Sequence, residues 1–537
     1  MTGFGVFRSL LEADFHYNGT VIPVSNPDAL LDIKAEVEDF LGAHANSVLV
    51  EDGAELMDLS RSTSRVSIEH GKLLFEAWNG ARSIVRRVEE VAYRDQGRLG
   101  LFARRPAARE AGVLELRDGG SPAPAERAEA RSAVRRDLTA YLQKCFPEWR
   151  LDRVSNRSDR EHSFSAWYTR GLARRGNRAW AFIGLGQDES SAAADAALAY
   201  GLNWLDRLRA APERAVISGI KLFLPEAAIP LNALRAGALN PRAAEVEIYE
   251  WPARGAAEPI SPGSFANLET HLVPRRDPAA AIERRRDLLR EILGPFFDRI
   301  DIAAEAGAGV LSLRVHGLEI ARLEGQVAPR LVWGIEGNRR ALRPDAGGSD
   351  RDEFLAFVGS ALATRDHAAR DPGHEMYRLQ PERWLESLLI RDLSKLDPEL
   401  RGDYVYPQVP AFSGVDRGVV DILSLSKDGR LAVIELKLYE DIALPFQGLD
   451  YWLRVKWLND RRQFQAFGYF RGVELSPLPP RLYLISPAFR FHPSNERLIR
   501  YFDPSIEVIQ AGLNQQWRQG VKVLFRRAFR DVTESGA

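Results

Sequence analysis

Two β-strands joined by a tight turn are predicted by the stretch Gly418-Val-Val-Asp-Ile-Leu-Ser-Leu-Ser-Lys-Asp-Gly-Arg-Leu-Ala-Val-Ile-Glu-Leu-Lys437. The segment from Val419 to Leu425 is apolar and rich in β-branched residues, and Leu431 to Leu438 is a second apolar run. Between them lies Asp428-Gly429, a dipeptide typical of hairpin turns. The chain is therefore expected to form a buried β-hairpin here.

Three charged residues interrupt this apolar hairpin: Asp421 on the first strand, and Glu435 and Lys437 on the second. Side chains alternate along a strand, so Glu435 and Lys437 project from the same face. Charges inside a buried strand are costly unless they are paired or bind a metal. Two carboxylates converging from adjacent strands would suit Mg²⁺, which takes few protein ligands and keeps several waters. A buried salt bridge among the three residues is the alternative, and the sequence leaves it open.

The pattern resembles the PD-(D/E)XK nuclease superfamily, whose motif is an Asp, a β-turn and then Glu-x-Lys. The resemblance implies a Mg²⁺-dependent nuclease, with Mn²⁺ as a substitute, that cuts DNA or in some cases RNA. It assigns the metal to Asp421 and Glu435. Lys437 would orient the attacking water and stabilise charge that develops on the phosphate.

Two flanking helices extend the resemblance towards RecB-like and NucS-type nucleases. Gln447 and Tyr451 are four residues apart on a predicted helix from Phe446 to Trp457, and they match the Gln-x-x-x-Tyr motif of RecB-type enzymes. Upstream, Glu386 on a predicted helix that begins at Pro381 resembles a helical acid that binds the metal. A solvated surface carboxylate is the alternative for Glu386. The resemblance covers about residues 377–529 and implies an α/β fold of the restriction-endonuclease type, a mixed sheet flanked by helices.

Length and composition fit a multidomain globular protein. The chain has 537 residues, of which 45% are apolar and 27% charged, and its net charge is −1. A nucleic-acid surface must therefore be a local patch. The single cysteine, Cys145, excludes an internal disulfide framework and fits a reducing compartment. We expect a cytoplasmic protein without membrane segments.

Gly-, Pro- and Ser-rich stretches divide the chain into four predicted units. These are a small α+β accessory domain at 1–117, a degenerate nuclease-fold domain at 126–251, a second α+β accessory domain at 265–343, and the nuclease domain at 376–537.

The order of these units predicts a duplication. Gly201-Leu-Asn-Trp echoes Gly448-Leu-Asp-Tyr, and each half carries an earlier hairpin around a His-Gly turn. In the first copy Gly184-Leu-Gly186 is expected to replace Glu435-Leu-Lys437, which would make residues 126–251 a pseudo-nuclease.

Three arginines near the motif, Arg417, Arg454 and Arg461, are candidates for nucleic-acid contact because aromatic residues accompany them. The resulting hypothesis is a Mg²⁺-dependent nuclease, with DNA favoured over RNA, in bacterial genome maintenance or phage defence. The alternative is a non-catalytic nucleic-acid-binding or scaffold protein that retains the fold. The sequence also leaves open whether two copies of the chain form a homodimer.

Overall fold

The computed structural model describes residues 27–529 except 45, 52, 70, 80–81, 96, 106–107, 109–110, 120–123, 160, 212–214, 253–257, 262–269, 276–277, 305–309, 326–327, 336–339, 343–347 and 414–415. Side chains of residues 27–28, 61, 124–127 and 411–418 are likewise outside the description. The first 26 residues of the predicted accessory domain, and the last eight of the nuclease domain, lie outside the described residues.

The N-terminal unit is an antiparallel sheet with the strand order β2-β1-β7-β6-β5-β4-β3. One helix, α1 (Pro27–Ala43), packs its apolar residues Leu30, Val37 and Phe40 against the sheet core. The strands are β1 (Ser47–Glu51), β2 (Ala54–Asp58), β3 (Thr63–Glu69), β4 (Lys72–Trp78), β5 (Ser83–Asp95), β6 (Arg98–Arg104) and β7 (Ala111–Asp118).

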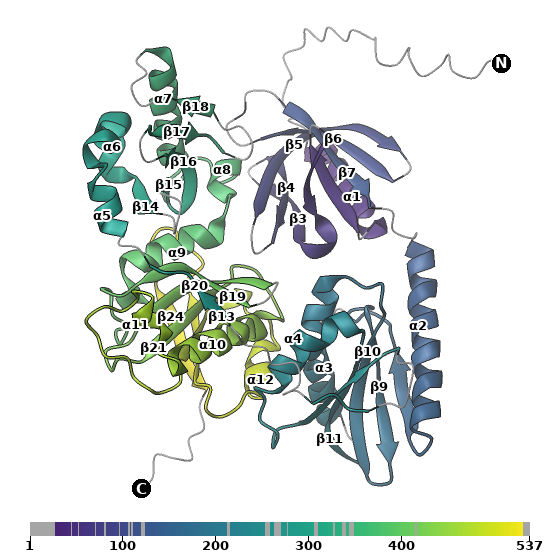
Figure 1. Cartoon of the computed structure of the whole chain (residues 1–537). Coiled ribbons are helices and arrows are strands. Elements are labelled where there is room, and N and C mark those ends of the chain that lie inside the picture. The colour runs from purple at the N-terminus through teal and green to yellow at the C-terminus, as the bar shows by residue number, and fades with distance from the viewer. Residues whose placement is uncertain are drawn as a thin grey trace, which may run out of the picture.

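The second unit is a mixed sheet, β12-β11-β10-β9-β8, with helices on both faces (Figure 1). Its strands are β8 (Arg150–Ser155), β9 (Tyr168–Arg175), β10 (Arg178–Leu185), β11 (Val216–Leu224) and β12 (Glu245–Glu250). Its helices are α2 (Pro124–Cys145), α3 (Ser191–Ala210) and α4 (Ile229–Ala236).

The third unit is a five-stranded antiparallel meander. Its strands are β14 (Asp301–Ala304), β15 (Leu311–Val315), β16 (Leu318–Glu324), β17 (Arg330–Trp333) and β18 (Arg340–Leu342). Helices α5 (Pro278–Glu283), α6 (Arg286–Leu293) and α7 (Ser349–Thr364) accompany it.

The C-terminal unit is a seven-stranded mixed sheet, β13-β19-β20-β21-β22-β23-β24. The strands are β13 (Thr270–Leu272), β19 (Tyr406–Ser413), β20 (Asp416–Leu425), β21 (Leu431–Leu436), β22 (Arg481–Pro487), β23 (Val508–Leu513) and β24 (Val523–Phe529). The helices are α8 (Glu375–Arg378), α9 (Pro381–Arg391), α10 (Leu444–Asp460), α11 (Gln463–Ala466) and α12 (Asn495–Ile499). The protein thus belongs to the mixed α/β class.

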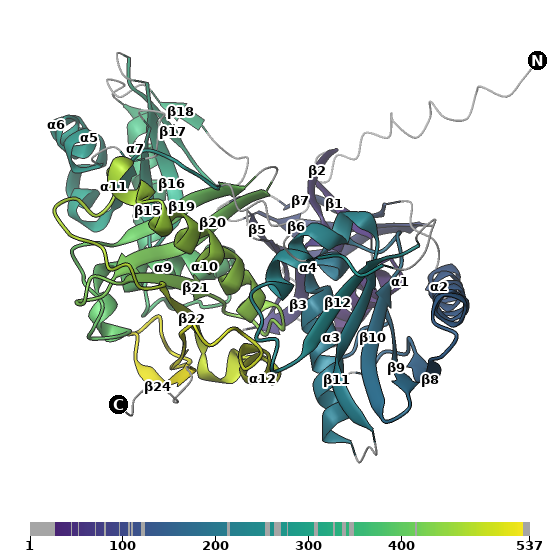
Figure 2. The same ribbon diagram turned by 60° about the horizontal axis from the view of Figure 1, so that its bottom comes forward.

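The predicted hairpin is formed by β20 and β21, which pair antiparallel from Ile422–Ile434 to Leu425–Leu431. Gly429 provides the turn with a φ of +79°. Every side chain of β21 is buried, because α9 covers one face of the sheet and α10 the other (Figure 2).

The second and fourth units share one topology. Each has a helix, three antiparallel strands, a helix, a parallel strand, a further helix and a second parallel strand. Gly201 of α3 lets Leu222 of β11 approach to 2.9 Å of where a Cβ would lie, and Gly448 of α10 does the same for Leu484 of β22 at 2.6 Å. The two glycines therefore occupy equivalent positions where a helix crosses the sheet.

This equivalence corrects the predicted alignment of Gly184-Leu-Gly186 with Glu435-Leu-Lys437. Leu222 pairs with Ile183, whereas Leu484 pairs with Glu435, so Ile183 takes the place of Glu435. Gly184 faces α2, where a Cβ would collide with Leu138, and it corresponds to Leu436. The prediction was wrong by one residue because strand faces alternate and only the packing of the helices defines which face is which. By the same register, Arg170 stands for Asp421 and Leu185 for Lys437.

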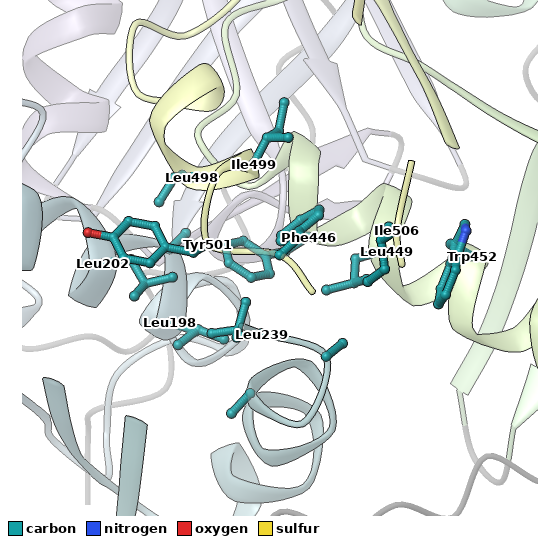
Figure 3. Packing of buried hydrophobic residues seen from close by; sticks show 14 of the residues in the cluster. Leu198, Leu202, Leu239, Phe446, Leu449, Trp452, Leu498, Ile499, Tyr501 and Ile506 are labelled. Atoms are coloured by element: carbon teal, nitrogen blue, oxygen red, sulfur yellow. The ribbon is translucent and has the colours of Figure 1, made fainter. Parts of the chain in front are cut away.

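The two α/β units pack against each other through the helices that follow their parallel strands (Figure 3). Leu239 forms an isolated antiparallel bridge with Phe502. Around this bridge the backbone N–H of Asn240 donates to Tyr501 (2.8 Å), and that of Asp503 donates to Ala238 (2.9 Å). These reciprocal contacts are those of an isologous interface, in which equivalent segments meet across a two-fold axis. The apolar core there is shared by Leu198, Leu202, Leu239, Phe446, Leu449, Trp452, Leu498, Ile499, Tyr501 and Ile506.

Candidate active site

Asp421 and Glu435 face each other across the β20–β21 hairpin, one step beyond the Ile422–Ile434 pair. The two carboxyl groups are close enough to affect each other's protonation, and Asp421 Oδ2 accepts from the backbone N–H of Leu436 at 3.0 Å. Glu435 is only 4% exposed, and its Oε2 has no partner among the described residues. Burial raises the pKa of both carboxyl groups, and for Glu435 the neighbouring Asp421 raises it further.

Lys437 brings a positive charge to this pair, with its Nζ 4.0 Å from Glu435 Oε1. Burial lowers its pKa, but the surrounding carboxylates of Glu382, Glu435 and Asp441 more than reverse that and hold it above its ordinary value. Lys437 is therefore a fixed cation. It compensates part of the negative charge, yet several carboxylates compete for one ammonium group.

The predicted helical acid, Glu386 on α9, is buried and lies beside Asp421 without touching it. Gln408 Nε2 lies between the two, donating to Glu386 Oε2 at 2.8 Å and to Asp421 Oδ1 at 3.3 Å. Arg383 also donates to Glu386 Oε2, at 3.0 Å. Burial raises the pKa of Glu386 to about 7, with Arg383 opposing the shift.

Gln447 and Tyr451 both lie on α10, and Tyr451 is close enough to the acids for their charges to act on it. Burial raises the pKa of Tyr451, and the negative charges of Glu435 and Asp421 add to the effect. Gln447 Nε2 lies 3.4 Å from Asp441 Oδ2, while its Oε1 is buried and has no partner in the described part of the chain. The phenol of Tyr451 is therefore near the acid pair, whereas the amide of Gln447 contacts Asp441.

Within the described residues, no three Asp, Glu, His or Cys side chains are placed so that they alone could hold a metal ion. The set Asp421, Glu435 and Glu386 that the sequence indicated is therefore not assembled as one cluster. The acid pair still fits a hard divalent cation, because two adjacent buried carboxylates repel each other and Glu435 Oε2 lacks a partner. Water would complete the coordination of such an ion.

A pocket of about 500 Å³ opens onto Asp421 between three of the four units. The C-terminal unit contributes Glu382, Arg383, Glu386, Gln408 and Asp421, and the third unit contributes Arg314, Leu318, Glu319 and Arg322. From the N-terminal unit come Glu76, Trp78, Asn79 and Arg82.

The N-terminal unit is held at this pocket by specific contacts with the C-terminal unit. Arg378 forms a bidentate pair with Glu76 (3.0 Å from Nε and from Nη2) and also binds Glu69. Trp78 stacks on Tyr439 with ring centroids 4.3 Å apart. The wall opposite the acids is thus made by residues about 300 positions earlier in the chain.

The three predicted nucleic-acid contacts have different outcomes. Arg454 is 4% exposed and is engaged inside the protein, so it does not present a surface to a ligand and that prediction was wrong. Arg461 is exposed but stacks on Trp457 at 4.0 Å, outside the residues that line the pocket. The side chain of Arg417 lies outside the described residues.

Sequence reasoning missed three residues of the site. Glu382 is half-buried on the first turn of α9, accepts from the backbone N–H of Leu438 at 3.3 Å, and supplies the largest attraction on Lys437. Its spacing of four from Glu386 was a usable signal, because such residues share a helix face. No comparable pattern in the sequence pointed to Gln408 or Arg383. Gln408 reaches the acids because its backbone is left-handed (φ +52°) where it falls out of the β19–β20 ladder.

Comparisons with known proteins give this site no name: no protein-family model matches the chain, and no match was found among curated proteins. None of the helices in the described ranges has the length and apolarity needed to cross a membrane.

Proposed function

We propose that the protein is a metal-dependent nuclease that hydrolyses phosphodiesters of nucleic acid, with DNA favoured over RNA, at the acid pair Asp421–Glu435. The observation that carries the proposal is this pair of carboxylates beside Lys437, of which Asp421 lines a pocket that arginines also line. A scaffold has no need to keep a lysine and several acids buried at one point, because each costs free energy. The proposal includes a restriction-endonuclease-like fold for the C-terminal unit.

In this proposal Asp421 and Glu435 would hold Mg²⁺. The ion would polarise a phosphoryl oxygen of the substrate and lower the pKa of a bound water. Lys437 stays protonated and stabilises negative charge on the phosphate. Glu382 acts on the reaction through Lys437, by fixing its ammonium group. Arg314 and Arg322 of the third unit, and Arg82 of the first, line the pocket and are suited to contact phosphates.

The test is incubation of the full chain with supercoiled plasmid, linear duplex, single-stranded and flap DNA, and RNA, in Mg²⁺, Mn²⁺ or EDTA. We expect cleavage with either metal and none in EDTA. Asp421→Asn, Glu435→Gln and Lys437→Ala should each lower the rate by at least 100-fold, in line with removing a group that acts on the transition state.

Glu474→Gln serves as the matched control, because Glu474 is an exposed acid of the same unit. It should retain the wild-type rate. Binding of nucleic acid without cleavage in any metal would replace the nuclease proposal with that of a binding protein. Wild-type rates in the three site variants would show that the activity belongs elsewhere in the chain.

A further inference from the structure

A second pocket, of about 320 Å³, adjoins the one that opens onto Asp421. The two pockets share Glu76, Arg378, Pro381 and Tyr439, so they are contiguous. A chain-like ligand bound at Asp421 would therefore lie next to the second pocket. The sequence did not indicate any of the charged or aromatic residues of this second pocket as site residues.

The second pocket has an excess of positive charge. Four arginines line it against two glutamates. Arg65 and Arg378 are neutralised, because both pair with Glu69 and Glu76. The other two, Arg490 and Arg518, form no ion pair with any described residue.

Arg518 is held rigidly without a carboxylate partner. Its guanidinium carbon lies 4.3 Å from the ring centroid of Trp517 and 4.8 Å from that of Tyr377. Its Nε is buried and makes no hydrogen bond within the described residues. Such a stacked arginine has already lost most of its side-chain freedom, so little further entropy is lost when it binds an anion.

A second buried cation, Arg365, lies close to Arg518, and the combined positive charge favours the binding of an anion. Arg365 lies on the other side of Trp384, its guanidinium carbon 4.6 Å from the ring, and Arg518 lies 5.1 Å from the same ring. Burial lowers the pKa of Arg365 to about 9, and the charge of Arg518 contributes to that shift. Arg365 uses its hydrogen bonds on backbone carbonyls of Val315, His316, Met376 and Leu379. Arg518 remains the cation available to a ligand.

We infer that Arg518 and Arg490 form a phosphate-binding subsite, which holds a backbone phosphate of the nucleic-acid strand on one side of the scissile bond. The inference rests on the proposed function for the identity of the strand. Arg518 gives the fixed contact and the exposed Arg490 closes the open side of the pocket. Tyr377, Tyr439 and Trp517 provide aromatic surface beside the phosphate, a combination typical of single-strand grooves.

Binding measurements test the subsite directly. Fluorescence anisotropy would follow a labelled 12-nucleotide single strand, with and without a 5′-terminal phosphate, on the Asp421→Asn background so that no cleavage occurs. Arg490→Ala and Arg518→Gln should each raise the Kd at least threefold. Each should also reduce the slope of log K against log salt by about 0.7, the value for one phosphate contact on a single strand.

Arg207→Ala is the charge-matched control, because Arg207 is an exposed arginine on α3 outside both pockets. Its Kd and salt slope should equal those of the parent. Arg490 is exposed, so its variant keeps the test valid even where Arg518→Gln loses stability. A larger loss for the 5′-phosphorylated strand would identify a terminal phosphate as the ligand, and equal losses an internal one. If Arg490→Ala and Arg518→Gln bind both strands as the control does, the inference is overturned.

A small diester separates this inference from the proposed function. Bis(p-nitrophenyl) phosphate is too small to occupy both pockets at once, so Arg490→Ala in the otherwise wild-type chain should reduce its hydrolysis less than it reduces cleavage of the 12-nucleotide strand. Loss of that hydrolysis in Arg490→Ala would contradict a separate subsite. If the wild-type chain hydrolyses neither the diester nor DNA, yet binding depends on Arg490, the nuclease proposal fails and the subsite stands.

Discussion

At the scale of single residues, the site concentrates more negative charge than one lysine can neutralise. Glu382, Glu386, Asp421 and Glu435 all have raised pKa values, and burial is the largest cause for each. Without a bound cation the folded state therefore holds these carboxylates at a cost. Such local instability is common where a binding site must be ready for its ligand.

Glu386 makes this cost measurable as a dependence of stability on pH. Its pKa is about 7 in the folded state, against 4.5 as its ordinary value. The folded protein then binds the proton more tightly than the unfolded chain, so the free energy of unfolding falls as the pH rises from about 4.5 to about 7. In Glu386→Gln the contribution of this carboxyl group to the pH dependence is removed. The free energy of unfolding should therefore decrease less over this pH range than in the wild type, by on the order of 3 kcal/mol at most. Urea unfolding in EDTA at intervals from pH 4.5 to 8 checks this. Parallel curves for the variant and the wild type would contradict the assignment.

A variant of Gln447 tests whether this residue is a ligand of the metal or only positions other groups of the site. Its Oε1 is buried and unpartnered, and within the described residues no hydrogen bond joins Gln447 to Asp421 or Glu435. We expect Gln447→Ala to lower cleavage less than Glu435→Gln does and to leave Mg²⁺ affinity within about twofold of wild type. Titration calorimetry provides the measurement. Equal loss of Mg²⁺ affinity in the two variants would make Gln447 part of the metal site.

At the scale of secondary structure, helices α4 and α10 join the two α/β units through one buried ion pair. Arg235 on α4 donates to both carboxylate oxygens of Asp450 on α10, at 2.9 and 2.6 Å. The two side chains are 4% and 12% exposed. On the other side of the interface Asn203 takes the place of Asp450, and its Oδ1 accepts from Ser494 Oγ at 2.8 Å and from Arg497 Nη2 at 3.5 Å. The two-fold arrangement has therefore diverged in chemistry while keeping its packing.

Removing one partner of this pair should be more harmful than removing both. Asp450→Ala leaves Arg235 buried without its carboxylate, which costs about 3–5 kcal/mol, whereas Arg235→Leu combined with Asp450→Leu should recover much of that loss. Urea unfolding monitored by tryptophan fluorescence gives the values. Glu245→Ala is the control, because its partner Arg178 is 57% exposed and such pairs contribute at most about 1 kcal/mol. A cost below that of the control would mean that the pair does not join the units.

At the scale of the whole molecule, two units of one topology carry one set of acids. The positions of Asp421, Glu435 and Lys437 are occupied by Arg170, Ile183 and Leu185 in the second unit. Arg170 is buried and stacks on Phe164 at 4.7 Å, which fills the equivalent space. Under the proposed function the chain is an internal dimer with a single active site.

One active site per chain predicts single-strand breaks. At low protein concentration, supercoiled plasmid should become nicked circle, and linear DNA should appear later or only where two chains associate. Agarose gels over time, together with light scattering to establish the mass in solution, test this. Immediate linear product from a monomer would contradict it, as would a metal bound by the second unit. A variant that converts Arg170 to Ala should leave the product pattern unchanged.

Features that depend on neighbours along the chain could be predicted from the sequence. The hairpin, its Asp-Gly turn, the face shared by Glu435 and Lys437, and the helices bearing Glu386 and Gln447 follow from strand alternation, helix spacing and turn chemistry. Those rules act over a few residues. The assignment of Gly184 failed within the same rules, since a one-residue shift exchanges the two faces of a strand and only the packing of α2 and α3 distinguishes them. Only contacts between distant segments explain that Gln408 lies between Glu386 and Asp421, that Glu382 is the carboxylate acting most strongly on the charge of Lys437, and that Trp78 and Glu76 line the pocket from 300 or more residues away. These contacts join distant segments through the burial of apolar and charged surfaces, and no local pattern in the sequence encodes which surfaces meet.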